Sequence, residues 1–149
     1  MDVVVLVGLQ ASGKTTFFGA RFAATHALAS KDLLRSARDR NARQEALVRA
    51  AAAAGRSIVV DNTNARREDR IALVALARGL GMRPVSYEFT PDVPASLVRN
   101  ALRSGRARVP EVAIHATRAR LAPVGPDEGF EARYQVRTVP GAFEIVRAR

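Results

Sequence analysis

Apolar residues occur along this chain in short continuous runs, separated by longer stretches in which apolar and polar positions alternate with a helical period. A run bounded by turn residues and rich in β-branched side chains is typical of a strand buried on both faces of a parallel sheet. Four such runs are predicted as strands, covering Asp2–Val7, His26–Ser30, Ser57–Asp61 and Pro84–Phe89.

The stretches between these runs carry the spacing of amphipathic helices. Gly55 marks the end of the longest one, because glycine readily adopts the left-handed conformation that closes a helix. The predicted helices are Lys14–Thr25, Arg38–Ala54, Arg67–Gly79, Pro94–Ser104 and Pro110–Leu121.

The segment YQVRTVPGAFEIV predicts a terminal pair of strands, with the turn at Pro140-Gly141. Alternation of strands and helices over most of the chain indicates an α/β fold with a central, mainly parallel sheet flanked by helices. Residues 1–149 are expected to form a single domain.

The first strand runs directly into the turn GLQASGKT at Gly8–Thr15, which fits the phosphate-binding pattern G-x-x-x-x-G-K-[ST]. Glycines in such a loop let successive backbone N–H groups point at phosphate oxygens, and the helix that follows adds the positive end of its dipole. Lys14 is expected to reach the β- and γ-phosphates, and the Thr15 hydroxyl to bind Mg²⁺. ATP and Mg²⁺ are therefore the expected donor and metal. The residues expected to bind nucleotide are Gly8, Ala11, Ser12, Gly13, Lys14, Thr15 and Thr16.

A phosphate-binding loop identifies the donor and leaves the acceptor open. A chain of 149 residues is short for a GTPase with its switch segments or for a ring-forming ATPase module, and this favours a kinase.

Two carboxylates follow predicted strands, at the edge where open parallel sheets build their ligand sites. Asp32 comes after the second strand and could act as the base for an acceptor hydroxyl, or it could open a helix at Leu33 as its N-cap. Asp61 ends the third strand, which is a position suited to holding Mg²⁺ through water. The alternative for Asp61 is a polar turn in which Asn64 caps the next helix.

An arginine-rich turn, RNALRSGRARVP, lies between the last two predicted helices. Kinases need a lid that excludes water and neutralises the charge on the transferred phosphoryl group, and arginine supplies that charge. The same residues could instead form a solvated basic turn. The four arginines concerned are Arg99, Arg103, Arg106 and Arg108.

The main information in the composition is an excess of basic over acidic residues. There are 24 lysines and arginines against 14 acids, a formal net charge of +10, and this favours polyanionic partners. A GC-rich genome would also raise the arginine and alanine content, but it does not explain the shortage of acids. The chain has no cysteine, and its N-terminal apolar run is too short to span a bilayer, so we expect a cytoplasmic protein without a membrane partner.

Taken together, these motifs resemble the 5′-kinase domain of polynucleotide kinases, which repair nucleic-acid ends. Ser30-Lys31-Asp32 is similar to that family's Asn-Arg-Asp step, VVDNTN at 59–64 is very close to its third-strand motif, and Arg99–Arg103 resembles its lid motif. Val109-Pro110 and Glu128–Phe130 are similar to later landmarks of the animal enzymes.

The resemblance implies a P-loop kinase core with an arginine-bearing helical lid. It places Asp32 as the general base and Arg103 as the lid arginine, both catalytic together with Lys14. The residues that it assigns to substrate binding are Arg35, Asp61, Thr63 and Asn64.

The implied activity is ATP-dependent transfer of phosphate to a 5′-hydroxyl end of DNA or RNA. Two alternatives stay open. One is a small-metabolite, nucleoside or zeta-toxin-like kinase of the same superfamily. The other is a non-catalytic nucleotide-dependent binding module, which would keep the phosphate loop but have no need of Asp32.

Overall fold

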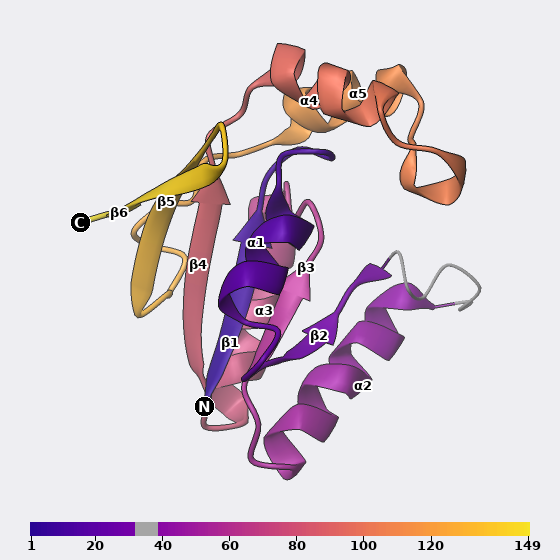
Figure 1. Cartoon of the computed structure of the whole chain (residues 1–149). Helices are drawn as coiled ribbons and strands as arrows, with labels where there is room; N and C mark the ends of the chain where they lie inside the picture. Colours follow the sequence, from indigo (N-terminus) through magenta and orange to yellow (C-terminus); the bar gives the residue numbers. More distant parts are fainter. Residues whose placement is uncertain (32–38) are drawn as a thin grey trace.

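A computed structural model describes residues 1–31 and 39–149 of the chain. Its centre is a six-stranded sheet in the order β2-β3-β1-β4-β5-β6, in which only the β5–β6 pair is antiparallel (Figure 1). The strands are β1 (Asp2–Val7), β2 (Ala27–Ala29), β3 (Ile58–Asp61), β4 (Arg83–Phe89), β5 (Ala132–Val139) and β6 (Ala142–Arg147). The expected α/β fold with a mainly parallel sheet is confirmed.

Within residues 1–31 and 39–149, five α-helices connect these strands, and a short 3₁₀ turn at Gly105–Ala107 lies between the last two. The helices are α1 (Lys14–Arg21), α2 (Arg40–Ala53), α3 (Arg67–Gly79), α4 (Val93–Ala101) and α5 (Glu111–Arg120). None of the helices in the described ranges is long and apolar enough to cross a membrane.

Alternate residues of β1 serve the two faces of the sheet, as the pleat requires. Val3, Val5 and Val7 pack with residues of α2 and α3 on one face. Val4 and Leu6 pack on the other face with Phe17 of α1. The sheet is therefore covered on both sides, which explains why its central strands are continuously apolar.

The predicted helix over Lys14–Thr25 is too long by four residues. Phe22 leaves the helical conformation with a φ of −124°, and the backbone N–H of Ala23 donates to the carbonyl of Phe18 at 3.0 Å. This turn places the Phe22 ring 5.8 Å from that of buried Phe17 and 5.6 Å from that of Tyr87. Packing of the Phe22 ring therefore ends α1, and the hydrophobic period of the sequence could not predict this.

Helices α4 and α5 form a lid above the carboxyl ends of the strands, beyond the loop that joins β1 to α1 (Figure 1). Both are shorter than the predicted helices, because residues 102–110 turn back between them. Asn100 holds this turn with its side-chain amide, donating to the Val109 carbonyl at 2.7 Å and accepting from the Val109 N–H at 3.0 Å. The fold thus carries the arginine-rich segment to the same edge of the sheet as the phosphate-binding loop.

Candidate active site

The phosphate-binding loop sits in tight contact with the strands around it. A side chain at Gly8 would place its Cβ 2.9 Å from the Cβ of Phe89, which is closer than carbon atoms can pack. Gly13 precedes α1 with a φ of 97°, in the left-handed region that glycine adopts without strain. These two positions explain why the motif has glycine at both ends of the loop.

Lys14 is the buried cation at the centre of the loop, and the residue is only 8% exposed. Its ammonium nitrogen Nζ donates to the carbonyls of Gly8 at 3.1 Å and Leu9 at 2.5 Å, and to the Ser12 hydroxyl at 3.3 Å. The loop therefore concentrates a full positive charge where backbone N–H groups and a helix N-terminus already favour an anion.

An oxygen pair lies beside this cation. The Thr15 hydroxyl donates to the Asp61 carboxylate at 2.9 Å, joining the start of α1 to the end of β3. Asp61 comes to this place because β3 runs parallel to β1, with Asp61 paired to Leu6 in the register. A hydroxyl and a carboxylate oxygen are ligands that suit Mg²⁺, so the residues present fit the metal that the loop motif implies.

The segment after β3, residues 62–66, lies beside the phosphate loop. The Thr63 carbonyl accepts from the N–H of Gly8 at 3.0 Å. The Asn62 side chain accepts from the N–H of Lys31 at 2.7 Å and donates to Gln44 of α2. Asn64 is buried and donates to the Leu6 carbonyl at 2.7 Å, so its side chain ties this segment to β1.

These elements enclose one cavity of about 230 Å³. Lys14, Thr15 and Asp61 line it from below, and Arg103 faces it from the lid. Thr63 lines it too, with Lys31 at the end of the described segment that follows β2. The residues singled out from the sequence that line this cavity are Ala11, Ser12, Lys14, Thr15, Asp61, Thr63 and Arg103.

The other lid arginines have different positions. Arg99 donates to the Ala11 carbonyl at 3.2 Å and so holds the lid against the phosphate loop. Arg106 and Arg108 are exposed and do not line the cavity. Asp32 and Arg35, which the resemblance places on the acceptor side, lie outside the described residues.

A second groove, of about 460 Å³, lies on the other side of the phosphate loop and shares Ser12 with it. Its lining includes Ser96 and Arg99 of α4, and Thr138 near the end of β5 with the turn residue Pro140. The Thr138 hydroxyl donates to the Ser12 carbonyl at 2.8 Å, which anchors the terminal hairpin to the loop. Sequence reasoning missed this contact, since nothing in the motif points to a residue 126 positions away.

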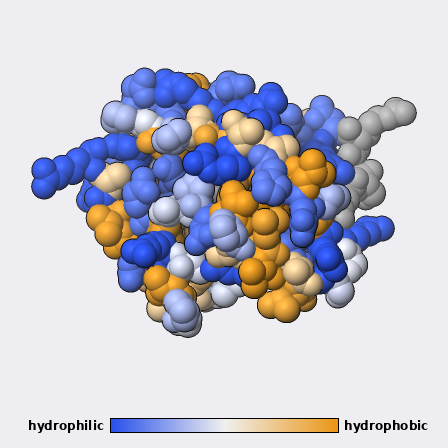
Figure 2. Space-filling view, turned by 90° about the horizontal axis from the view of Figure 1, so that it is seen from above, coloured by the Kyte–Doolittle hydropathy of each residue, from blue (hydrophilic) through white to orange (hydrophobic). Residues whose placement is uncertain are grey.

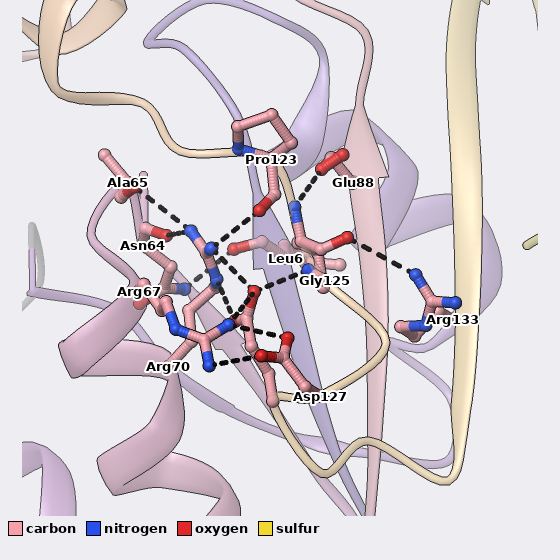
Figure 3. A network of polar contacts seen from close by, with 12 residues as sticks. Leu6, Asn64, Ala65, Arg67, Arg70, Glu88, Pro123, Gly125, Asp127 and Arg133 are labelled. Carbon is pink, nitrogen blue, oxygen red and sulfur yellow. Dashed lines mark hydrogen bonds and ion pairs between the residues drawn. The ribbon is translucent and has the colours of Figure 1, made fainter.

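A buried ion pair between Arg70 and Glu128 supports the segment after β3 (Figure 3). Arg70 of α3 is 0% exposed and donates to both oxygens of Glu128, at 2.7 and 3.0 Å. Its remaining donors reach the carbonyls of Asn64 and Ala65 at 3.0 Å each, and that of Pro123 at 3.2 Å. One guanidinium therefore fixes the segment after β3 and the chain that returns from the lid.

The face above the site is mostly hydrophilic, with apolar patches between the polar side chains (Figure 2). The lid itself, over residues 93–121, contains six arginines and one glutamate. Its exposed large apolar residues are Val98, Leu102 and Val112.

A family model described as an AAA domain matches residues 3–124, which is most of the chain. No curated protein matches the chain significantly.

Several solved structures share the fold at low identity. Kti12 from Chaetomium thermophilum, in complex with ADP-AlF3, is 19% identical with a TM-score of 0.65, covering 91% of this chain and 88% of that one. A gluconokinase from Sinorhizobium meliloti 1021 is 18% identical with a TM-score of 0.65, covering 91% and 82%. A chain of the PezAT toxin-antitoxin system of Streptococcus pneumoniae is 13% identical with a TM-score of 0.70, covering 91% and 68%.

Proposed function

This chain belongs to the AAA_33 family of AAA domains, and from that premise we propose that it is an ATP-dependent P-loop kinase acting on a hydroxyl acceptor. One observation carries the proposal. Lys14, Asp61 and Arg103, which come from three separate segments, line the same cavity together with Thr15. Lys14 and Arg103 place positive charge on two sides of the cavity, and Thr15 and Asp61 offer oxygen ligands for a metal. Phosphoryl transfer requires this arrangement.

In the proposed reaction, the acceptor oxygen forms a bond to the γ-phosphorus while the bond from that phosphorus to the β–γ bridging oxygen breaks. Lys14 and Arg103 neutralise the negative charge on the transferred group, and ADP leaves. Thr15 and Asp61 would hold Mg²⁺, which supplies further neutralisation of phosphate charge. The acceptor proton passes to Asp32, the base that the resemblance assigns.

The groove shared by Ser12, Arg99 and Thr138 suits the nucleoside part of the donor. It opens on the far side of the phosphate loop from Lys31 and Thr63, which leaves the cavity side for the acceptor. The donor would then lie across the loop, with its phosphates pointing toward Arg103.

A small hydroxyl compound is the acceptor that the comparisons support best. The similar structures include a gluconokinase and a protein named as a sugar kinase from Janibacter sp.. The similar structures also include a chain of a toxin-antitoxin system, in line with the zeta-toxin-like alternative.

A 5′-hydroxyl end of DNA or RNA is the second candidate, and a specific observation favours it. The net charge is +10, and the lid above the cavity carries six arginines against one glutamate. Such a surface attracts a phosphodiester backbone. The close agreement of residues 59–64 with the polynucleotide kinase motif supports the same acceptor.

Transfer of labelled phosphate from ATP to a panel of acceptors tests the proposal. The panel contains 5′-hydroxyl DNA and RNA oligonucleotides, nucleosides, sugars and sugar acids. Labelling of sugars or nucleosides alone would support a small acceptor, and labelling of oligonucleotides alone would support the second candidate. ATP binding without transfer to any member would favour a non-catalytic binding module.

A further inference from the structure

We propose that the acceptor carries an anionic group, and that a groove next to the phosphate cavity binds that group. This acceptor groove has a volume of about 320 Å³ and lies beside the segment that follows β3. Its charged lining residues are Lys31, Arg66, Asp69 and Arg120. The inference rests on the proposed kinase function, because it assigns the part of the acceptor that does not react.

The groove is continuous with the place where phosphate would be transferred. Lys31, Asn62 and Thr63 line both the phosphate cavity and the acceptor groove. A molecule with its hydroxyl beside Thr63 would therefore extend its remaining atoms into the groove, away from the donor.

Three cations converge on the groove from segments that are far apart in the sequence. Lys31 follows β2, Arg66 precedes α3, and Arg120 ends α5. In the part of the chain that the structure describes, none of these three has a carboxylate within ion-pair distance. Asp69 is the single acid among the described lining residues, so the groove has an excess of positive charge.

Arg120 is held in place by a contact that also involves the phosphate loop. Its guanidinium donates to the hydroxyl of Thr117 at 3.2 Å, and Thr117 is fully buried. The same hydroxyl accepts from the Gln10 side chain at 2.9 Å. This contact orients Arg120 relative to the site. Arg118 on the same helix is exposed, as Arg120 is, but it does not line the groove.

The uncharged lining of the groove is held by hydrogen bonds. Asn62 is fixed on both sides by Lys31 and Gln44, and the Asn64 and Ala65 carbonyls are fixed by buried Arg70. Binding an anion would therefore require ordering of the cationic side chains alone, which limits its entropic cost.

The chemistry that fits is a hydroxyl compound bearing a carboxylate or a phosphate a few bonds from the reacting oxygen. A sugar acid supplies the first, and a nucleoside 3′-phosphate supplies the second. Arginine binds both groups through paired N–H donors, so the groove itself recognises the anionic charge that they share.

Matched acceptor pairs test the inference. One pair is glucose and gluconate, and the other is thymidine and thymidine 3′-monophosphate. For wild-type protein, we expect kcat/KM to be at least about tenfold higher for the anionic member of the pair that is used. Arg66→Ala and Arg120→Ala should each lower that value about tenfold or more through KM, leaving the neutral member unchanged. Arg118→Ala is the control and should behave as wild type.

A binding measurement separates this inference from the proposed function. Gluconate and thymidine 3′-monophosphate are titrated calorimetrically into protein saturated with a non-hydrolysable ATP analogue, so that the phosphate loop is filled. Binding that weakens in Arg120→Ala without any turnover would support the groove while overturning the kinase. Turnover with no preference for the anionic member would overturn the groove while supporting the kinase. Binding of neither compound, or an equal loss in Arg118→Ala, would also overturn the groove.

Discussion

Arg103 differs from its neighbouring arginines because it lines the phosphate cavity, whereas Arg106 and Arg108 are exposed outside it. If Arg103 meets the transferred phosphoryl group, Arg103→Ala should lower kcat by about a hundredfold or more. Arg106→Ala and Arg108→Ala should change kcat much less. Steady-state kinetics on the three variants check this, and equal losses would mean that the lid acts as a diffuse basic surface.

The two possible roles of Asp32, helix N-cap and general base, predict different results for Asp32→Asn. An N-cap role predicts that Asp32→Asn is harmless, because asparagine caps a helix about as well as aspartate. A base role predicts a fall in kcat of about a hundredfold or more, with nucleotide affinity and melting temperature unchanged. Measuring all three on one preparation decides between them, and a normal kcat would remove Asp32 from the mechanism.

The residues that the sequence alone could identify are those whose role depends on local spacing. Lys14 and Thr15 follow from the loop motif, and Asp61 follows from its place at the end of a strand. Arg70 and Asn100 could not be found in this way. Arg70 acts through Glu128, which is 58 positions away, and a charged residue in a helical pattern is ordinarily solvated.

The individual elements follow the sequence closely in the sheet and less closely in the lid. Helix α3 has the predicted bounds of Arg67–Gly79, because its apolar stripe faces the sheet along its whole length. The lid helices are shorter than predicted, and the Asn100 side chain holds the turn between them by bonding to both backbone groups of Val109. Side-chain contacts of this kind cannot be predicted from the spacing of apolar residues in the sequence.

The connection between α1 and β2 predicts a dependence of stability on pH. The ring of His26 packs on that of Phe22 with centroids 4.8 Å apart. Burial, aided by Arg56 and the chain's amino terminus and opposed by Asp2, lowers the pKa of His26 below 6.5. The unfolded state therefore binds a proton more readily, and the free energy of unfolding should fall as the pH drops through 6.5.

Thermal denaturation between about pH 7.5 and pH 5.5 measures this effect. The melting temperature should fall with pH in wild-type protein and fall less in His26→Gln. His115→Gln, at an exposed position of α5, is the matched control. An identical pH dependence in wild type and His26→Gln would contradict the assignment.

For the molecule as a whole, the buried Arg70–Glu128 pair joins parts that the sheet alone does not connect. It binds α3 to the segment after β3 and to the chain returning from the lid. Arg70→Met should lower the free energy of unfolding by about 3–5 kcal/mol, because the buried Glu128 carboxylate loses the guanidinium that donates to both of its oxygens, and Arg67 stays 3.7 Å away. The double variant Arg70→Met/Glu128→Met should recover part of that loss.

Urea denaturation of the single and double variants tests this role. Arg49→Ala serves as the control, because Arg49 forms an exposed pair with Glu45 one helical turn away and should cost only about 0.3–0.5 kcal/mol. A loss in Arg70→Met no larger than in the control would show that the pair does not hold these parts together.

The central claim is that Lys14 and the residues around its cavity transfer phosphate from ATP to a hydroxyl. The most direct measurement is transfer of labelled γ-phosphate by wild type and by Lys14→Ala, with the melting temperature of each recorded. We predict transfer by the wild type and its loss in a folded Lys14→Ala variant, because the cation expected to meet the β- and γ-phosphates is then missing. Substantial transfer by folded Lys14→Ala protein would contradict the account.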